Sequence, residues 1–190
     1  QALAADDMPA IALTDQSNLF AMVKFTRAAL GAGIKPIIGV DALVRHGDDQ
    51  EAPFQLVLLA QNKTGYLNIS QLISRRYLEG YHRGLPIIQS EWIVQRAEGI
   101  IALSGGRQGD IGRALLAGKS DLAQQRLQTW AACFKDRFYL ELQRTGRENE
   151  EAYIAEAVEL AITHDVPVVA TNDVRFLKSE EFDAHETRVC

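Results

Sequence analysis

The stretch from Val166 to Phe176 (VPVVATNDVRF) constrains the fold of this chain most strongly. Its apolar half, through Ala170, predicts a buried strand, and the residues from Thr171 to Arg175 predict a polar turn directly after it. In α/β sheets, binding and catalytic groups lie in loops past the carboxyl ends of strands. This turn is therefore the first place to look for a site.

Two further apolar runs lead into an aspartate. Ala10 to Leu13 is followed by Asp15, and Ile37 to Val40 is followed by Asp41. Together with Asp173 in the turn, these residues predict strand ends that converge on one polar pocket. The alternative for each aspartate alone is that it caps the next helix.

Strand and helix patterns alternate along the whole chain, about six times. Strands are predicted at 10–13, 35–44, 54–60, 100–103, 137–142 and 166–170. Helices are predicted at 19–30, from 62 to about 77, near 90–94, on both sides of Gly118, and around 150–161, and a polar hairpin-like loop is predicted at 45–53. This alternation predicts an α/β fold of parallel strands with right-handed crossovers, either a distorted barrel or an open doubly wound sheet.

Composition bounds the class of protein. The 190 residues are 47% hydrophobic, enough for one domain with a real core. A net charge of −5 argues against a dedicated nucleic-acid surface, which needs clustered Lys and Arg. Cys133 and Cys190 lack metal spacing, and no signal peptide or membrane-spanning run is visible, so we expect a cytoplasmic protein with reduced thiols. Gln1 and Cys190 both lie in apparent helices, which suggests a piece of a longer polypeptide whose first strand precedes Gln1.

A basic and aromatic run occupies 75–83 (RRYLEGYHR). Such a run can meet nucleic acid or a protein partner, although most runs of this kind are solvated helix ends.

Common catalytic motifs are missing. The glycine-rich run from Gly105 to Gly112 lacks the dinucleotide fingerprint, and Gly118-Lys119-Ser120 lacks the earlier glycine of a P-loop. No G-x-S-x-G nucleophile motif occurs. Among the histidines only His185 lies just past the last predicted strand, and one histidine with three aspartates makes a poor transition-metal site.

Six separated motifs together resemble one family. They are ALTDQSNL (12–19), GAGIKPIIGVD (31–41), NKTGYLNISQLIS (62–74), GIIALSGG (99–106), FYLELQRTG (138–146) and VVATNDVRFL (168–177). In this order they resemble the PHP (polymerase and histidinol phosphatase) domains at the N-termini of bacterial DNA polymerase III alpha subunits.

The resemblance implies a fold, a role and partners. The fold would be a distorted (βα)7-type barrel, with 1–190 as a PHP domain truncated at its N-terminal strand. The parent would be the replicative DNA polymerase, with its catalytic carboxylates outside this chain and Mg2+ as its expected cofactor. The implied partners are the proofreading exonuclease (epsilon) subunit, the remainder of the alpha subunit, and DNA through the parent polymerase, with no membrane.

Carried over residue by residue, the family's metal pocket is degenerate in this sequence. The family's Thr-Asp-His is Thr14-Asp15-Gln16, its glutamate is Asp41, its cysteine is Gly106, the histidine of its Glu-x-x-x-His-Gly turn is Thr145, and its Asp-x-His is Asp173-Val174-Arg175. Glutamine and threonine are weak ligands, glycine offers no side chain, and arginine has no lone pair to donate.

These exchanges predict a pocket with no catalytic residue, no metal and no cofactor of its own. We expect Arg175 to occupy the former metal space and neutralise Asp15, Asp41 or Asp173. The resulting hypothesis is a catalytically silent scaffold that docks the exonuclease. The alternatives are a metal-dependent phosphoesterase or 3'–5' exonuclease of the same superfamily, and a plain nucleic-acid-binding module.

Overall fold

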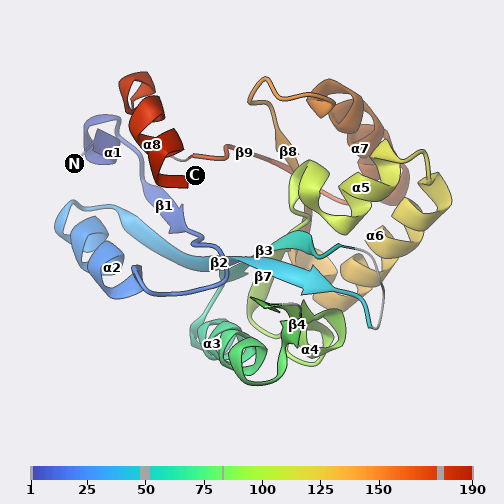
Figure 1. The fold of residues 1–190 in the computed structure, drawn as a ribbon, viewed down its shortest axis with the longest axis horizontal. Helices are drawn as coiled ribbons and strands as arrows, with labels where there is room; N and C mark the ends of the chain where they lie inside the picture. The colour runs from blue at the N-terminus through green and yellow to red at the C-terminus, as the bar shows by residue number, and fades with distance from the viewer. Residues whose placement is uncertain (1, 48–51, 83, 175–177, 190) are drawn as a thin grey trace.

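The computed structural model describes residues 2–47, 52–82, 84–174 and 178–189. Its centre is a curled, mixed sheet with helices packed around the outside (Figure 1). The strands run in the order β1-β2-β3-β7-β8-β9, and β6 pairs with β2. Their bounds are β1 (Ala10–Leu13), β2 (Lys35–Arg45), β3 (Phe54–Ala60), β6 (Ile88–Gln89), β7 (Ile100–Leu103), β8 (Phe138–Gln143) and β9 (Val168–Thr171).

The expectation of parallel strands throughout was wrong for two pairs. β2 pairs antiparallel with β3, and β3 pairs antiparallel with β7. The connection between β2 and β3 is the polar loop predicted at 45–53, which is too short for a crossover helix, so the chain turns back as a hairpin. The pairs β1–β2, β7–β8 and β8–β9 are parallel.

Most predicted helices occur. Their bounds are α1 (Ala2–Ala5), α2 (Met22–Gly31), α3 (Lys63–Glu79), α4 (Ser90–Val94), α5 (Asp110–Leu116), α6 (Ser120–Phe134), α7 (Glu150–His164) and α8 (Phe182–Val189). α2 begins three residues later than predicted from Leu19. Ser17 and Asn18 are residue types that favour helix N-caps, which predicts a helix start near Leu19. Ser17, however, has a positive φ of 58°, and the Asn18 side chain accepts a hydrogen bond from Phe20 N at 2.9 Å, so both residues belong to a turn instead.

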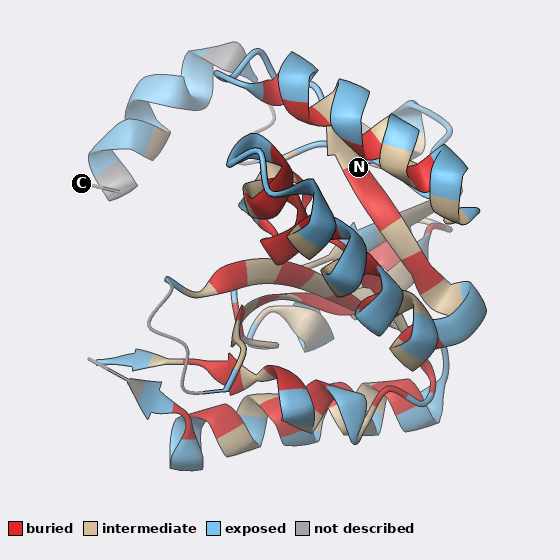
Figure 2. Ribbon diagram, turned by 90° about the vertical axis from the view of Figure 1, so that its right-hand side faces the viewer, coloured by how far each residue is buried: buried red, intermediate tan, exposed pale blue. Residues whose placement is uncertain are grey.

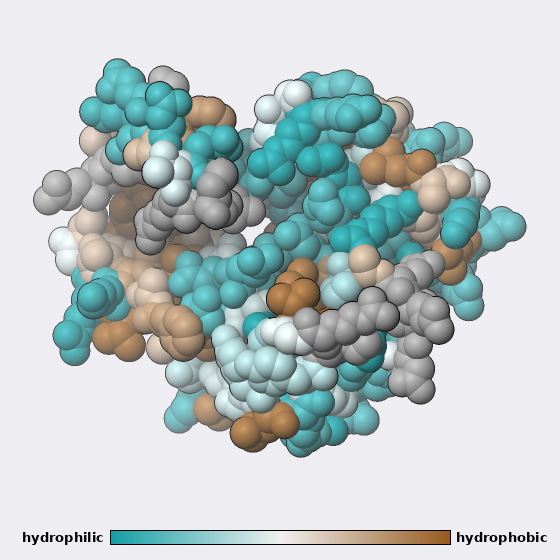
Figure 3. All heavy atoms as spheres, in the orientation of Figure 1, coloured by the Kyte–Doolittle hydropathy of each residue, from teal (hydrophilic) through white to brown (hydrophobic). Residues whose placement is uncertain are grey.

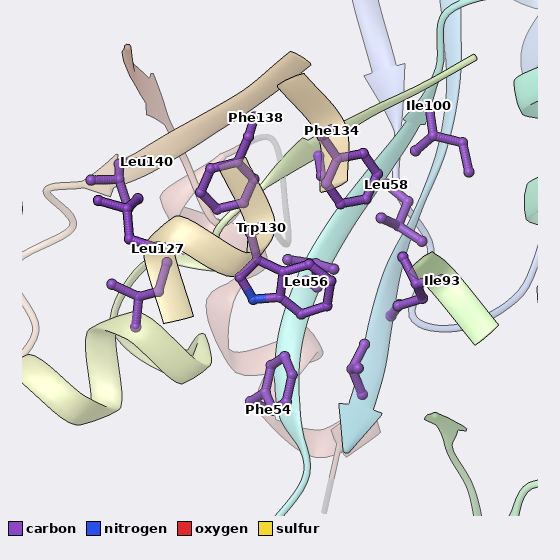
Figure 4. Packing of buried hydrophobic residues seen from close by; sticks show 14 of the residues in the cluster. Phe54, Leu56, Leu58, Ile93, Ile100, Leu127, Trp130, Phe134, Phe138 and Leu140 are labelled. Carbon is purple, nitrogen blue, oxygen red and sulfur yellow. The ribbon is translucent and has the colours of Figure 1, made fainter. Parts of the chain in front are cut away.

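The core lies between the central strands and helices α3 and α6. Trp130, Phe134 and Phe138 stack in series with ring centroids 6.1 Å and 6.4 Å apart (Figure 4). The spacing of Ala123, Leu127, Trp130 and Phe134 predicts one buried face of α6, and all four are buried. These aromatic rings pack beside the aliphatic side chains of β3 and fill the space between the helix and the sheet.

The helices turn exposed residues outward, and the central strands carry much of the buried surface (Figure 2). The outer strands β1 and β9 contain no fully buried residue. β9 was expected to be buried, but Val168 is 46% exposed and Ala170 is also exposed. Among the described strands, β9 pairs with β8 alone and forms one edge of the sheet, with β1 at the other. Apolar composition predicted the strand correctly and its position in the sheet wrongly.

A small second sheet projects beside α3. It is an antiparallel hairpin of β4 (Tyr81–His82) and β5 (Leu85–Pro86). Gly80 N donates to Arg76 O at 3.0 Å, and Ile87 N donates to Gly80 O at 2.9 Å, which fixes the hairpin to the end of the helix.

Candidate functional site

The predicted site residues fall into two groups at different strands. Asp15, Gln16 and Asp41 lie at the β1–β2 side, and Gly106, Thr145 and Asp173 lie around the ends of β7, β8 and β9. Arg175 lies outside the described residues. Its predicted place among the aspartates therefore stays a prediction.

At the β1–β2 side, the loop after β1 is fixed to the middle of β2. Asp41 N donates to Asp15 O at 3.2 Å, and Ser17 N donates to Asp41 O at 2.8 Å. Asp41 lies within β2, which continues to Arg45, so the strand predicted at 35–44 is confirmed and the expectation that Asp41 follows a strand end is wrong. Gln16 forms an isolated bridge with Asp41, and its side chain is exposed.

Ser17 holds that loop in place, a role different from the helix cap that its residue type suggests. It is 2% exposed, and its Oγ accepts a hydrogen bond from Leu43 N at 3.3 Å. The Ser17 carbonyl accepts a hydrogen bond from Arg76 Nη1 of α3 at 2.8 Å. A buried serine with left-handed backbone therefore connects β2, α3 and the loop that carries Asp15.

Gly106 opens a short 3-10 turn (Gly106–Gln108) after β7 and is buried. A Cβ atom built on Gly106 would lie 3.6 Å from Gln143 Oε1, which is ordinary contact. At Gly105 a Cβ would lie 2.2 Å from Gln55 O. Of these two glycines, only Gly106 therefore has room for a side chain, and that side chain would face β8.

Glu141 on β8 is the most deeply buried carboxylate near Asp173, and it is not among the residues predicted to line the pocket. It is 3% exposed and accepts a hydrogen bond from Thr171 Oγ1 at 2.5 Å. Burial raises the pKa of Glu141 above its ordinary value, hydrogen bonds from Thr171 and Gln143 oppose the shift, and the charge of Asp173 adds to it. Its Oε2 has no hydrogen-bond partner among the described residues. The alternation of residues along a strand predicts which face of the sheet a side chain lies on. It does not predict that a glutamate on that face is buried.

Thr145 is exposed, and both its side chain and its backbone bond the carboxylate of Glu150. Its Oγ1 donates to Glu150 Oε1 at 2.6 Å, and its N–H donates to Glu150 Oε2 at 2.6 Å. Gly146 N and Arg147 N donate to the same Oε2 at 2.8 Å and 3.1 Å. The Thr145–Arg147 loop is therefore wrapped around the carboxylate of Glu150.

This wrapping sets the ionisation of Glu150. Burial alone would raise its pKa, but the hydrogen bonds from Thr145, Arg147 and Gly146 outweigh burial and hold the pKa below the ordinary value. The sequence pattern had suggested only that Glu150 favours the positive end of α7.

Asp173 meets a cation from this same loop. Arg147 Nη2 lies 2.9 Å from Asp173 Oδ2, and the Asp173 side chain is 19% exposed. Arg147 was not among the residues predicted to line the pocket, and this ion pair does not test the prediction made for Arg175. The only sequence signal for Arg147 is its place in the turn after β8.

Two of the predicted pocket positions are already engaged with other protein groups. The Thr145 hydroxyl donates to Glu150, and the Arg147 guanidinium pairs with Asp173. Within the described ranges, no group of three or more His, Cys, Asp or Glu is placed to hold a metal. A positive guanidinium beside a carboxylate opposes binding of a further cation.

Comparison with protein-family models gives a match to the PHP domain over residues 1–145. The chain belongs to the PHP domain family. The DNA polymerase III subunit alpha of Pseudomonas aeruginosa is 49% identical over 190 residues, and that of Escherichia coli K12 is 51% identical over 186 residues. These matches cover 100% and 98% of this chain but only 16% of each relative, so the chain spans a small part of their length.

Two solved structures share the PHP-type fold at low sequence identity. A Bifidobacterium adolescentis protein assigned as a metal-dependent phosphoesterase aligns with a TM-score of 0.58 at 12% identity, covering 98% of this chain and 88% of that one. A Chromobacterium violaceum amidohydrolase with bound sulfate and no metal aligns with a TM-score of 0.54 at 14% identity, covering 97% and 88%. At these identities the likeness concerns the fold alone. No described helix of the PHP domain has the length and apolar character needed to cross a membrane.

Proposed function

We propose that this PHP domain is a catalytically silent scaffold within a DNA polymerase III alpha polypeptide and a docking site for the proofreading exonuclease subunit. The polymerase subunits that match nearly the whole chain at 49% and 51% identity support its place within such a polypeptide. Template-directed DNA synthesis, with its Mg2+, would then belong to the part of the polypeptide outside this chain.

The observation that carries the silent role is the ion pair between Arg147 and Asp173 at 2.9 Å. In a hydrolytic site, carboxylates and imidazoles hold a cation that activates water. Here the Arg147 guanidinium already lies at the Asp173 carboxylate, and the threonine that stands where the resemblance places the family's histidine is bonded to Glu150.

The competing function is a metal-dependent phosphoesterase or 3'–5' exonuclease, to which the shared fold lends only general support. Isothermal titration with Mn2+ and with Zn2+ separates the two. We expect no binding at micromolar concentration and no release of phosphate from a nucleotide ester when either metal is added. Tight stoichiometric binding with metal-dependent hydrolysis would overturn the silent role.

Docking of the exonuclease subunit is tested separately from the absence of catalytic activity. Purified exonuclease subunit is passed over immobilised full-length alpha subunit, and over the same subunit lacking the PHP domain. Retention that depends on the PHP domain supports docking, and equal retention by both contradicts it.

A further inference from the structure

The outer face of helix α2 carries large apolar side chains that are exposed to solvent. Phe20, in the turn before the helix, is 85% exposed, and Val23 and Leu30 are 53% and 64% exposed. Lys24 and Arg27 are exposed between them, and we call these five residues the α2 face. Hydrophobic surface interrupted by hydrophilic surface lies at the left of the molecule in Figure 3, where Figure 1 places α2. The helix packs with its opposite side on the sheet.

Such a face is unusual for a surface helix, whose outward side chains are normally polar. Helix α7 of the same domain has the usual pattern, since Glu151, Glu156 and Glu159 are exposed while Tyr153 and Ala157 are buried. Exposed apolar side chains that lie together mark contact surfaces. The α2 face is therefore suited to a contact with protein.

The charge of the α2 face indicates the chemistry of its partner. Helix α2 contains Lys24 and Arg27 and no acidic residue, in a chain whose net charge is −5. Among the described residues, neither cation forms an ion pair. A segment that places apolar side chains on Phe20 and Leu30, and carboxylates beside the two cations, would complement both parts of the face.

A second copy of the domain and a nucleic acid both fit this face less well. Two copies related by a two-fold axis would bring Lys24 and Arg27 of one copy close to the same two cations of the other, and like charges repel. Single-stranded nucleic acid binds to platforms of aromatic rings on which successive bases stack. Phe20 is the single aromatic residue of the α2 face, and the aliphatic Val23 and Leu30 offer no ring for stacking.

We infer that the α2 face binds another part of its own polypeptide, outside residues 1–190, through apolar side chains flanked by carboxylates. The chain covers only 16% of each matched polymerase subunit, so most of such a polypeptide lies outside it. A tethered segment meets the face at a high effective concentration, which favours it over a free partner. This inference rests on the polymerase context of the proposed function and adds an intramolecular contact to it.

Hydroxyl-radical footprinting of the full-length alpha subunit measures whether the α2 face is covered. The oxidation rates of Phe20 and Leu30 are determined by mass spectrometry and corrected for the intrinsic reactivity of each residue type. We expect both rates to lie at least fivefold below that of Ile162 on α7, the matched control, which is 77% exposed in the domain. Rates equal to that of the control would overturn the contact.

The carboxylates of the partner segment are tested by zero-length carbodiimide cross-linking. We expect Lys24 to be joined to an aspartate or glutamate outside residues 1–190, and the exposed Lys119 to form no such link. Reversing both charges with Lys24→Glu and Arg27→Glu should raise the oxidation rate of Phe20 at least threefold. The matched control, Lys119→Glu with Lys135→Glu, should leave that rate unchanged, and thermal unfolding checks that each variant keeps its fold.

The remaining outcomes assign the α2 face to another occupant and overturn the inference. Protection of Phe20 that increases with subunit concentration, or cross-links between isotope-labelled and unlabelled copies, would assign the face to a second copy. Protection that requires added single-stranded DNA or purified exonuclease subunit would assign it to that partner. The silent role and exonuclease docking are measured separately by the metal titration and the retention experiment, so an exposed α2 face leaves both standing.

Discussion

Arg147 and Asp173 form an ion pair across two loops, with Nη2 and Oδ2 separated by 2.9 Å. Arg147 belongs to the loop after β8, and Asp173 follows β9. The loop is shaped by Glu150, which accepts a hydrogen bond from Arg147 N at 3.1 Å. The loop held by Glu150 at the start of α7 therefore places Arg147 beside Asp173, one of the aspartates that the sequence predicts in the pocket.

Replacing Arg147 should destabilise the domain through this pair. We expect Arg147→Met to lower the free energy of unfolding by about 1 kcal/mol, because the Asp173 side chain is only 19% exposed. Arg144→Met is the matched control, since Arg144 pairs with Glu151 where the two side chains are 70% and 71% exposed. Urea unfolding should show almost no change for the control, and equal losses in both variants would refute a special role for Arg147.

Removing the charge of Glu141 should stabilise the domain at neutral pH. Because burial raises the pKa of Glu141 in the folded state, the folded protein binds more protons than the unfolded one just above pH 4.5, and wild-type stability falls as pH rises. Glu141→Gln has no such loss, so its advantage should appear above that pH and vanish below it. Unfolding curves from pH 4 to 8 measure this, with exposed Glu148→Gln as the control. A variant less stable than wild type at pH 8 would contradict the prediction.

Glu150→Gln should have the opposite effect. Hydrogen bonds hold the pKa of Glu150 below its ordinary value, so its contribution is present at neutral pH and is lost as pH falls through the folded-state pKa. We expect a loss of roughly 1–3 kcal/mol at pH 7, as for hydrogen bonds to a charged acceptor. The difference from wild type should disappear in acid, and a loss independent of pH would indicate that packing, not charge, is responsible.

Gly105→Ala tests the tight turn after β7. Gly105 has a φ of 75°, and an added Cβ would lie 2.2 Å from Gln55 O, so we expect a loss of about 3 kcal/mol or more. Gly118→Ala is the control, because its φ is 67° but nothing lies within 4 Å of the added Cβ, which leaves a cost of about 1–2 kcal/mol. Similar losses in both variants would show that backbone strain alone explains the effect.

The sequence by itself determined the elements and the family. Apolar runs gave β3 and β7 with their observed bounds, and helical spacing gave the buried face of α6, because both depend on local periodicity. Six motifs in order sufficed to suggest PHP ancestry, and the family match over 1–145 confirmed it.

Only the tertiary structure decided strand direction, edge position and the partners of charged groups. Periodicity carries no information on which strands are neighbours, so the antiparallel β3 and the exposed β9 were missed. The partners Glu150, Arg147 and Glu141 lie on different elements from the aspartates and glycines that motifs mark. Electrostatic and hydrogen-bond energies depend on distances through space, and those distances exist only once the chain has folded.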